Sequence, residues 1–314
     1  MSTVPVVFLG TPAFAQFHLQ KLIDDEHFHV VGVVSQPDRP AGRKMKLQAS
    51  AVKQCALDHD IPVITPEKMD DVAIAQIMQW RPEAAVVVAY GQILRNNFLN
   101  AFPNKVVNVH GSLLPRWRGA APIQRAIMEG DKTTGVCLQV MVRKLDAGPV
   151  LGSRSISITD QTTALNLHDE MMELGADLLH IEFMDYLRGN LSPVPQDEAL
   201  VTYAHKIEKS EGKIDWAQSA EVIFNRLRGL LMGPGSFTTQ ADGKKLKVHA
   251  VKPVDVESDK VAGEVVRLTD DELVIQTGQG GLQILEVQPE SKSKMSIEDY
   301  LRGYRLQAEK GFRS

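Results

Sequence analysis

The first 190 residues alternate between short β-branched runs and longer segments with helical periodicity, and this order restricts the fold more than any other feature. The runs that predict strands cover residues 4–9, 30–34, 62–64, 84–89, 106–110, 135–142 and 150–158. The segments that predict helices cover residues 12–24, 49–59, 69–80 and 162–188. A chain that alternates strand and helix in this way forms a parallel sheet covered by helices, with right-handed crossovers.

The rest of the chain has a different pattern. A helix is predicted over 218–230, and five short strands then cover 236–240, 244–251, 263–268, 272–277 and 282–287. Short strands separated by Gly and Asp-Gly turns predict a small five-stranded β-barrel of the oligonucleotide-binding (OB) type. Because 314 residues suit two domains of about 150 residues each, we predict domains at 1–190 and 213–314, joined by a polar linker at 191–212.

Composition excludes several classes of protein. The chain is 43% hydrophobic and 24% charged, which is ordinary for a globular protein, and its net charge of −4 argues against a surface covered by nucleic acid but allows a local basic patch. Cys55 and Cys137 lack His or Cys neighbours at ligand spacing, so neither a disulfide framework nor a zinc site is predicted. With no basic leader and no apolar run near 18 residues, we expect a cytoplasmic protein. The Gly10-Thr11-Pro12 turn is not a GxGxxG fingerprint, which argues against nicotinamide or flavin binding.

Polar side chains end the predicted strand at 106–110. Asn108 and His110 are two residues apart, so both leave the same face of the strand, at the carboxyl end where α/β sheets bind ligands. A histidine there is more often a structural residue than a catalyst, and the asparagine could cap a turn. The loop that follows, Pro115 to Gly119, is cationic and aromatic, and this favours a functional site.

Asp146 and the loop at 36–47 each allow two interpretations. Asp146 lies in a Lys-Leu-Asp-Ala-Gly-Pro turn, where it is either a plain turn residue or a carboxylate within reach of Asn108 and His110. The loop is long for a strand-to-helix connection, and its cations either form a solvated face or contact a phosphate backbone. Lysines of the linker and the barrel would extend such a patch, which comprises Arg39, Arg43, Lys44, Lys46, Lys206, Lys209, Lys244, Lys245 and Lys247.

Several longer motifs together resemble the methionyl-tRNA formyltransferases. They are QPDRPAGR from residue 36, AYGQIL at 89–94, NVHGSLLPRWRGAAPIQ at 108–124, LDAGPVL at 145–151, LVTYAHKI at 200–207, KIDW at 213–216 and LRGYRL at 301–306. The SLLP and DAG signatures are shared with the wider group of enzymes that use 10-formyltetrahydrofolate. The two-domain length and the QPDRPAGR loop narrow the resemblance to the tRNA-directed members, over essentially the whole chain.

The resemblance implies a doubly wound, Rossmann-like formyltransferase domain that binds 10-formyltetrahydrofolate, and an OB-type domain that helps to hold initiator methionyl-tRNA. It implies transfer of the formyl group to the α-amine of methionine for translation initiation, by a monomer that needs no metal. The implied catalytic residues are Asn108, His110 and Asp146; the implied folate contacts are Ser112, Leu113, Leu114 and Pro115; and the implied tRNA contacts are Arg39, Arg43, Lys44, Lys46 and Lys209.

One departure and two alternatives accompany this interpretation. Where the family commonly has Asn-Pro-Trp-Pro-Gly, this chain has Leu231-Met232-Gly233-Pro234-Gly235, which puts the packing between barrel and linker in question. The alternatives are a formyltransferase acting on an amino-sugar nucleotide and a non-catalytic tRNA-binding protein. The basic loop argues against the first, and the intact Asn-His-Asp set argues against the second.

Overall fold

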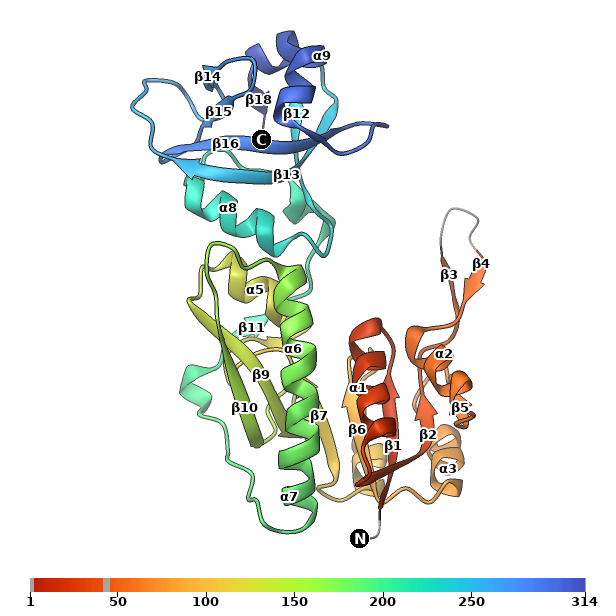
Figure 1. The fold of residues 1–314 in the computed structure, drawn as a ribbon. Coiled ribbons are helices and arrows are strands. Elements are labelled where there is room, and N and C mark those ends of the chain that lie inside the picture. The colour runs from red at the N-terminus through yellow and green to blue at the C-terminus, as the bar shows by residue number, and fades with distance from the viewer. Residues whose placement is uncertain (1–2, 42–45, 314) are drawn as a thin grey trace. The chain divides into compact units, whose positions relative to one another are not determined.

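The computed structural model describes residues 3–41 and 46–313, and the chain divides into two compact units (Figure 1). The first unit contains the residues up to Gly119 together with Thr134–Ile156 and His168–Tyr203. The second unit contains Ala120–Thr133, Ser157–Leu167 and the chain from Ala204 onward. No helix among the described residues is both long and apolar enough to span a membrane.

The first unit is built on a seven-stranded sheet of order β10-β9-β7-β6-β1-β2-β5. Strands β1, β2, β5, β6 and β7 run parallel to one another, and β9 runs antiparallel to β7, which confirms a mostly parallel α/β sheet. The strand bounds are β1 Val4–Gly10, β2 Phe28–Val34, β5 Val63–Ile64, β6 Ala84–Val88, β7 Val106–His110, β9 Thr133–Val140 and β10 Val150–Ser157.

Burial explains why the central strands are almost wholly apolar. Every residue of β6 is buried, as is β1 from Val6 onward, because parallel strands in the middle of such a sheet are covered on both faces. One apolar cluster includes Val7 and Leu9 of β1, Val87 of β6 and Phe98. The polar carboxyl end of β7 is therefore an exception within an apolar sheet.

Helices connect these strands. Ser50 and Asp70 cap the helices that follow them, because each side chain accepts a hydrogen bond from a backbone N–H three residues on. The helix predicted at 162–188 is present, but a π-helical segment at Leu179–Phe183 interrupts it. The helix bounds are α1 Ala13–Asp24, α2 Ala51–Asp58, α3 Asp71–Gln79, α4 Asn96–Ala101, α6 Ala164–Leu178 and α7 Met184–Leu187.

The stretch expected to be an irregular loop at 36–47 contains a β-hairpin instead. Strands β3 (Arg39–Ala41) and β4 (Lys46–Gln48) pair antiparallel, and Figure 1 shows them extending away from the sheet of the first unit. The two strands carry few apolar residues and share no sheet with the rest of the described chain, which is why hydrophobic periodicity did not predict them.

The second unit contains a curled antiparallel sheet rather than a sheet of only five strands. Its order is β14-β15-β16-β13-β12-β18, and β17 also pairs with β16. The five predicted strands correspond to β12 Ser236–Gln240, β13 Lys245–Val254, β14 Val265–Leu268, β15 Leu273–Gln276 and β16 Gly281–Pro289. The short strands β17 (Met295–Ser296) and β18 (Phe312–Arg313) were missed because two residues carry no readable alternation.

Three helices accompany this sheet: α5 (Pro122–Met128), α8 (Ala220–Gly229) and α9 (Ile297–Glu309). The sequence predicted α8 alone. Trp216 and Tyr300 are fully buried in the apolar core of this unit, and the indole N–H of Trp216 donates to the hydroxyl of Thr238 at 3.0 Å. A buried indole needs such a partner for its N–H group.

The segment at residues 231–235, where the sequence departs from the family pattern, packs closely against its neighbours. Leu231 is partly buried and packs against the core of the second unit. Gly212, at the end of the predicted linker, approaches Gly235 so closely that an added Cβ would lie 2.3 Å from its carbonyl oxygen. The contact between these two segments therefore requires the glycine at 212.

Candidate active site

Strand β7 places Asn108 and His110 on one face at the point where the parallel sheet meets its antiparallel neighbour. Asn108 is opposite Val87 of β6 and Gln139 of β9, and His110 is opposite Cys137. His110 is buried, whereas Asn108 is half-buried and its side chain has no hydrogen-bond partner among the described residues. The amide of Asn108 therefore remains free to donate to another molecule.

The imidazole of His110 is fixed by the chain that follows it. Its Nε2 lies 2.9 Å from the carbonyl oxygen of Trp117, and because a carbonyl only accepts, Nε2 carries the proton and donates. Its Nδ1 faces the carboxylate of Asp146 at 3.8 Å, which is beyond hydrogen-bonding distance. A neutral His110 thus presents a lone pair toward Asp146.

Asp146 lies beside His110 but is held by other groups. One carboxylate oxygen accepts from the backbone N–H of Gly119 at 2.9 Å, and the other accepts from the side-chain amide of Gln139 at 3.1 Å. The backbone of Asp146 has a φ of 45°, an uncommon conformation for a residue other than glycine. Gly148, two residues on, packs so tightly that a Cβ there would meet the carbonyl oxygen of Val140 at 1.7 Å.

The loop at 112–115 is anchored at two points. The buried hydroxyl of Ser112 donates to the carbonyl oxygen of Arg116 at 2.6 Å, and the backbone N–H of Leu114 donates to the sulfur of Cys137 at 3.3 Å. Burial raises the pKa of the Cys137 thiol to about 11, more than the contact with Leu114 lowers it. This thiol stays neutral near pH 7 and is not an activated nucleophile.

Three residues outside the predicted set of site residues hold this region together. Arg118, in strand β8 (Arg118–Gly119), is completely buried and donates to Gln196 at 2.8 and 3.0 Å and to Glu198 at 2.9 Å. Gln196 in turn donates to the backbone carbonyls of Asp146 at 2.9 Å and Gly148 at 2.7 Å. These bonds link the segment after β7 to the turn of Asp146.

Glu198 completes this network at its exposed side. It begins a 3₁₀ helix, Glu198–Leu200, and bridges Arg118 and Lys144. Its hydrogen bonds from Arg118 and then Lys144 lower the pKa of the Glu198 carboxyl to about 2. In the sequence, the one indication of this network was Arg118 itself, a charged residue inside the motif RWRG.

The structure distributes the predicted tRNA contacts over both units. Arg39 in β3 and Lys46 in β4 belong to the hairpin of the first unit and are exposed, and Arg39 contacts Glu67 at 3.4 Å. Lys209 is exposed in a 3₁₀ helix, Lys209–Gly212, of the second unit. Asp38 pairs with Lys53 at 2.9 Å rather than with the described hairpin cations. Arg43 and Lys44 lie outside the described residues.

Comparison with known proteins identifies the family. Residues 4–181 match the family model described as formyl transferase, and residues 206–305 match the formyl transferase C-terminal domain. The chain is 52% identical over 312 residues to the methionyl-tRNA formyltransferase of Bdellovibrio bacteriovorus, covering 98% of each chain. The chain belongs to the methionyl-tRNA formyltransferase family. It is also 42% identical over 311 residues to the enzyme of that name from a Sulfurihydrogenibium species, covering 98% of this chain and 99% of the relative.

The fold of this formyltransferase is shared with enzymes of distant sequence. The solved structure of WlaRD, a sugar 3N-formyl transferase in the presence of dTDP and 5-N-formyl-THF, matches with a TM-score of 0.67. The match covers 93% of this chain and 100% of WlaRD at 16% identity. At this identity the likeness concerns the fold alone.

Proposed function

We propose that this chain transfers a formyl group from 10-formyltetrahydrofolate to the α-amine of methionine on initiator methionyl-tRNA, giving N-formylmethionyl-tRNA for translation initiation. The observation that carries the proposal is the 52% identity to a methionyl-tRNA formyltransferase over 98% of both chains. This likeness extends through both units and is not limited to the folate-related motifs.

Asn108, His110 and Asp146 are the proposed catalytic residues. The amine attacks the formyl carbon and forms the new C–N bond, giving a tetrahedral oxyanion; the bond from carbon to N10 of the folate then breaks. The free amide of Asn108 can donate an N–H to that oxyanion, and oriented donors of this kind stabilise developing charge. The proton that leaves the amine is needed by N10 when the folate departs, and Asp146 assists its removal.

The contacts of His110 suggest how this ring acts. A protonated imidazole has an N–H on both nitrogens, and Nε2–H is already committed to the carbonyl of Trp117. The added proton on Nδ1 therefore lies toward Asp146 and the space between them. There, we propose, it forms a charge-assisted hydrogen bond to the oxyanion while the Asp146 carboxylate stabilises the ring's charge.

The remaining assignments rest on motifs and placement. We propose that Ser112, Leu113, Leu114 and Pro115 contact the folate, since this loop follows the catalytic strand directly. The exposed hairpin cations Arg39 and Lys46, with Arg43, Lys44 and Lys209, are the proposed tRNA contacts. We further propose a catalytic domain at 1–190, a linker at 191–212, an OB-type tRNA-binding domain at 213–314, a cytoplasmic location and a monomeric state.

Formyl transfer from 10-formyltetrahydrofolate tests the function directly. Charged initiator tRNA and an amino-sugar nucleotide should be offered as acceptors in parallel, at equal concentration. We expect formylated methionyl-tRNA and no formylated sugar. Transfer to the sugar alone would assign the chain to the amino-sugar enzymes, and binding of tRNA without transfer would make it a non-catalytic tRNA-binding protein.

A further inference from the structure

A second group of histidine and carboxylate side chains lies in the first unit, away from the proposed active site. Among the described residues, Asp25, His27 and His180 each offer one ligand atom, and these atoms lie within 4.8 Å of one another. Asp25 is the C-cap residue that follows α1, and His27 immediately precedes β2. The group therefore lies at the amino ends of the parallel strands, whereas His110 lies at the carboxyl end of β7.

The carboxylate of Asp25 joins the two imidazoles. One oxygen accepts from Nδ1 of His27 at 2.9 Å, and the other accepts from Nδ1 of His180 at 2.6 Å. The side chain of Asp25 is only 8% exposed, so this carboxylate is held between the rings and largely out of water. Burial alone would raise its pKa, but the hydrogen bonds from His180 and His27 lower the pKa below its ordinary value.

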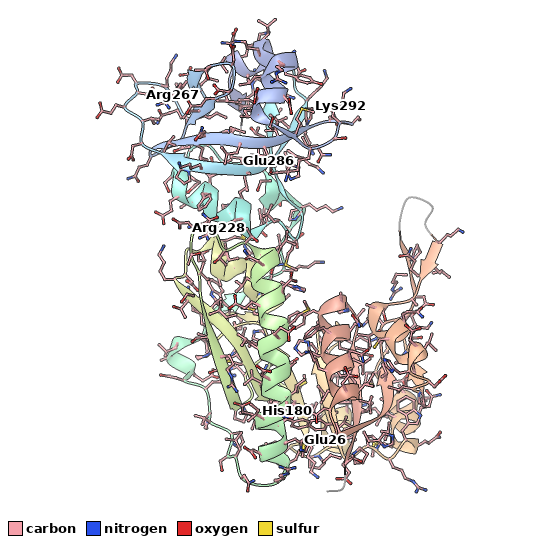
Figure 2. All side chains as sticks on the ribbon, viewed as in Figure 1. Glu26, His180, Arg228, Arg267, Glu286 and Lys292 are labelled. Carbon is pink, nitrogen blue, oxygen red and sulfur yellow. The ribbon has the colours of Figure 1, made fainter. Side chains whose placement is uncertain are left out.

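The backbone brings His180 to this position in an unusual way. His180 lies in the π-helical segment Leu179–Phe183, and π-helical turns of this kind often occur at functional sites. Figure 2 labels His180 together with Glu26, which lines the same pocket. This pocket has a volume of about 460 Å³, and its lining contains one lysine, Lys21, against four acidic residues, which are Asp24, Asp25, Glu26 and Asp177. Such an excess of acidic groups attracts cations.

We propose that Asp25, His27 and His180 bind a divalent transition-metal ion of the Zn²⁺ type. Two imidazoles and one carboxylate are a ligand set that Zn²⁺ uses in proteins, and three protein ligands leave a position for water. A neutral imidazole can move its proton from Nδ1 to Nε2, which frees Nδ1 for the metal without a change of charge.

Admitting the ion requires only a small movement. Ligand atoms about 2.0–2.2 Å from Zn²⁺ lie roughly 3.5 Å from one another. The two imidazole nitrogens, now 2.9 and 2.6 Å from the Asp25 oxygens, must therefore each move away from the carboxylate by no more than about 1 Å. The side chain of His180 is 56% exposed and free to make this adjustment. Neither Cys55 nor Cys137 belongs to this group of ligand atoms. The site plays no part in the proposed formyl transfer and goes beyond it.

Calorimetric titration of the full chain with Zn²⁺, after treatment with EDTA, tests the proposal. We expect one Zn²⁺ per chain, and at least ten-fold weaker binding in His27→Ala and in His180→Ala. Loss of a residue that only hydrogen-bonds to a metal ligand typically weakens metal binding by roughly 10–100-fold, and loss of the ligand itself should cost at least as much. His168→Ala is the matched control, since His168 contacts one carboxylate, Asp169, at 3.0 Å and has no place in the group of three.

Thermal unfolding provides a second readout that does not depend on formyl transfer. Zn²⁺ should raise the Tm of the wild-type chain and of His168→Ala, but not that of His180→Ala, because a ligand that binds the folded state stabilises it. His180→Ala removes a half-exposed side chain and should fold and transfer formyl groups normally. The proposal is overturned if the wild-type chain takes up no Zn²⁺, or if His27→Ala and His180→Ala bind it as tightly as the wild-type chain.

Discussion

The Asp25 cluster and the proposed active-site cluster, both in the first unit, each place histidine against a carboxylate, and they differ in the hydrogen bonds that these groups make. In the cluster of Asp25, both carboxylate oxygens accept directly from imidazoles, at 2.9 and 2.6 Å. In the proposed active-site cluster, His110 and Asp146 stay 3.8 Å apart, and each makes its hydrogen bonds to other groups. In the Asp25 cluster, the Nδ1–H groups of both imidazoles are already committed to the carboxylate. His110 and Asp146 are held apart by their other hydrogen bonds, which leaves space between them for the oxyanion of the proposed reaction.

The largest expected effect comes from removing the proposed hydrogen-bond donors of the active-site cluster. We expect Asn108→Ala and His110→Ala each to lower kcat by about 10²–10³, or roughly 3–4 kcal/mol, because each removes a donor to the oxyanion. The assay is formyl transfer to charged initiator tRNA at saturating substrates. His27→Ala removes a histidine from the other cluster and should retain wild-type turnover. Near-normal kcat in both active-site variants would remove the catalytic assignment.

Gln139 tests whether Asp146 must be held away from His110. Its amide donates to Asp146 at 3.1 Å, and a hydrogen bond to a charged group contributes about 1.5–3 kcal/mol. We expect Gln139→Ala to lower kcat by about ten-fold or more with little change in KM, because Gln139 positions Asp146 and does not bind substrate. Gln139→Glu, which keeps the shape but repels the carboxylate, should be worse than Gln139→Ala. Equal kcat in the wild type and in both variants would show that the placement of Asp146 does not depend on Gln139.

Variants of the hairpin cations test whether tRNA binding can be separated from the chemistry of the proposed active site. Arg39→Ala with Lys46→Ala should weaken tRNA binding and reduce the slope of log affinity against log salt by about 0.9 for each phosphate that is no longer neutralised. Turnover at saturating tRNA should be retained, the reverse of the result expected for His110→Ala. Filter binding across a salt series measures the slope, and a slope unchanged from the wild type would contradict a role for the hairpin.

The smallest effect concerns acid stability. Because the folded-state pKa of Asp25 lies below its unfolded value of 3.8, its contribution to stability is fully present above pH 3.8 and disappears as the pH falls below it. Asp25→Asn should therefore lower the Tm at pH 6. A loss of about 1 kcal/mol in the free energy of unfolding would lower the Tm by roughly 2–4 °C. The difference in Tm from the wild type should shrink below pH 3.8. A difference that is independent of pH would mean that the charge of Asp25 does not matter.

Hydrophobic patterning predicted the elements that bury apolar surface. Strand β6 is buried throughout and was found almost to the residue, and the position of Asn108 and His110 on one face follows from the two-residue period of a strand. The hairpin β3–β4, the strand β17 and the helix α4 were missed, because short or mostly polar elements leave no strong periodicity.

Contacts between residues far apart in the sequence could not be read in this way. Nothing near Asp146 in the sequence indicates that Gln196, fifty positions away, holds its backbone. Nor does the spacing of Asp25 and His180, 155 positions apart, suggest that they meet. Both contacts depend on how helices and strands pack, which is decided by the burial of many side chains together.

The sequence by itself determined the strand and helix order, the family, and which residue types stand at the end of β7. Only the tertiary structure decided that Asp146 is held beside His110 without bonding to it, and that a second carboxylate lies between two imidazoles. The physical reason is that periodicity reports the face on which a side chain lies, whereas hydrogen-bond partners are set by distances of a few tenths of an ångström.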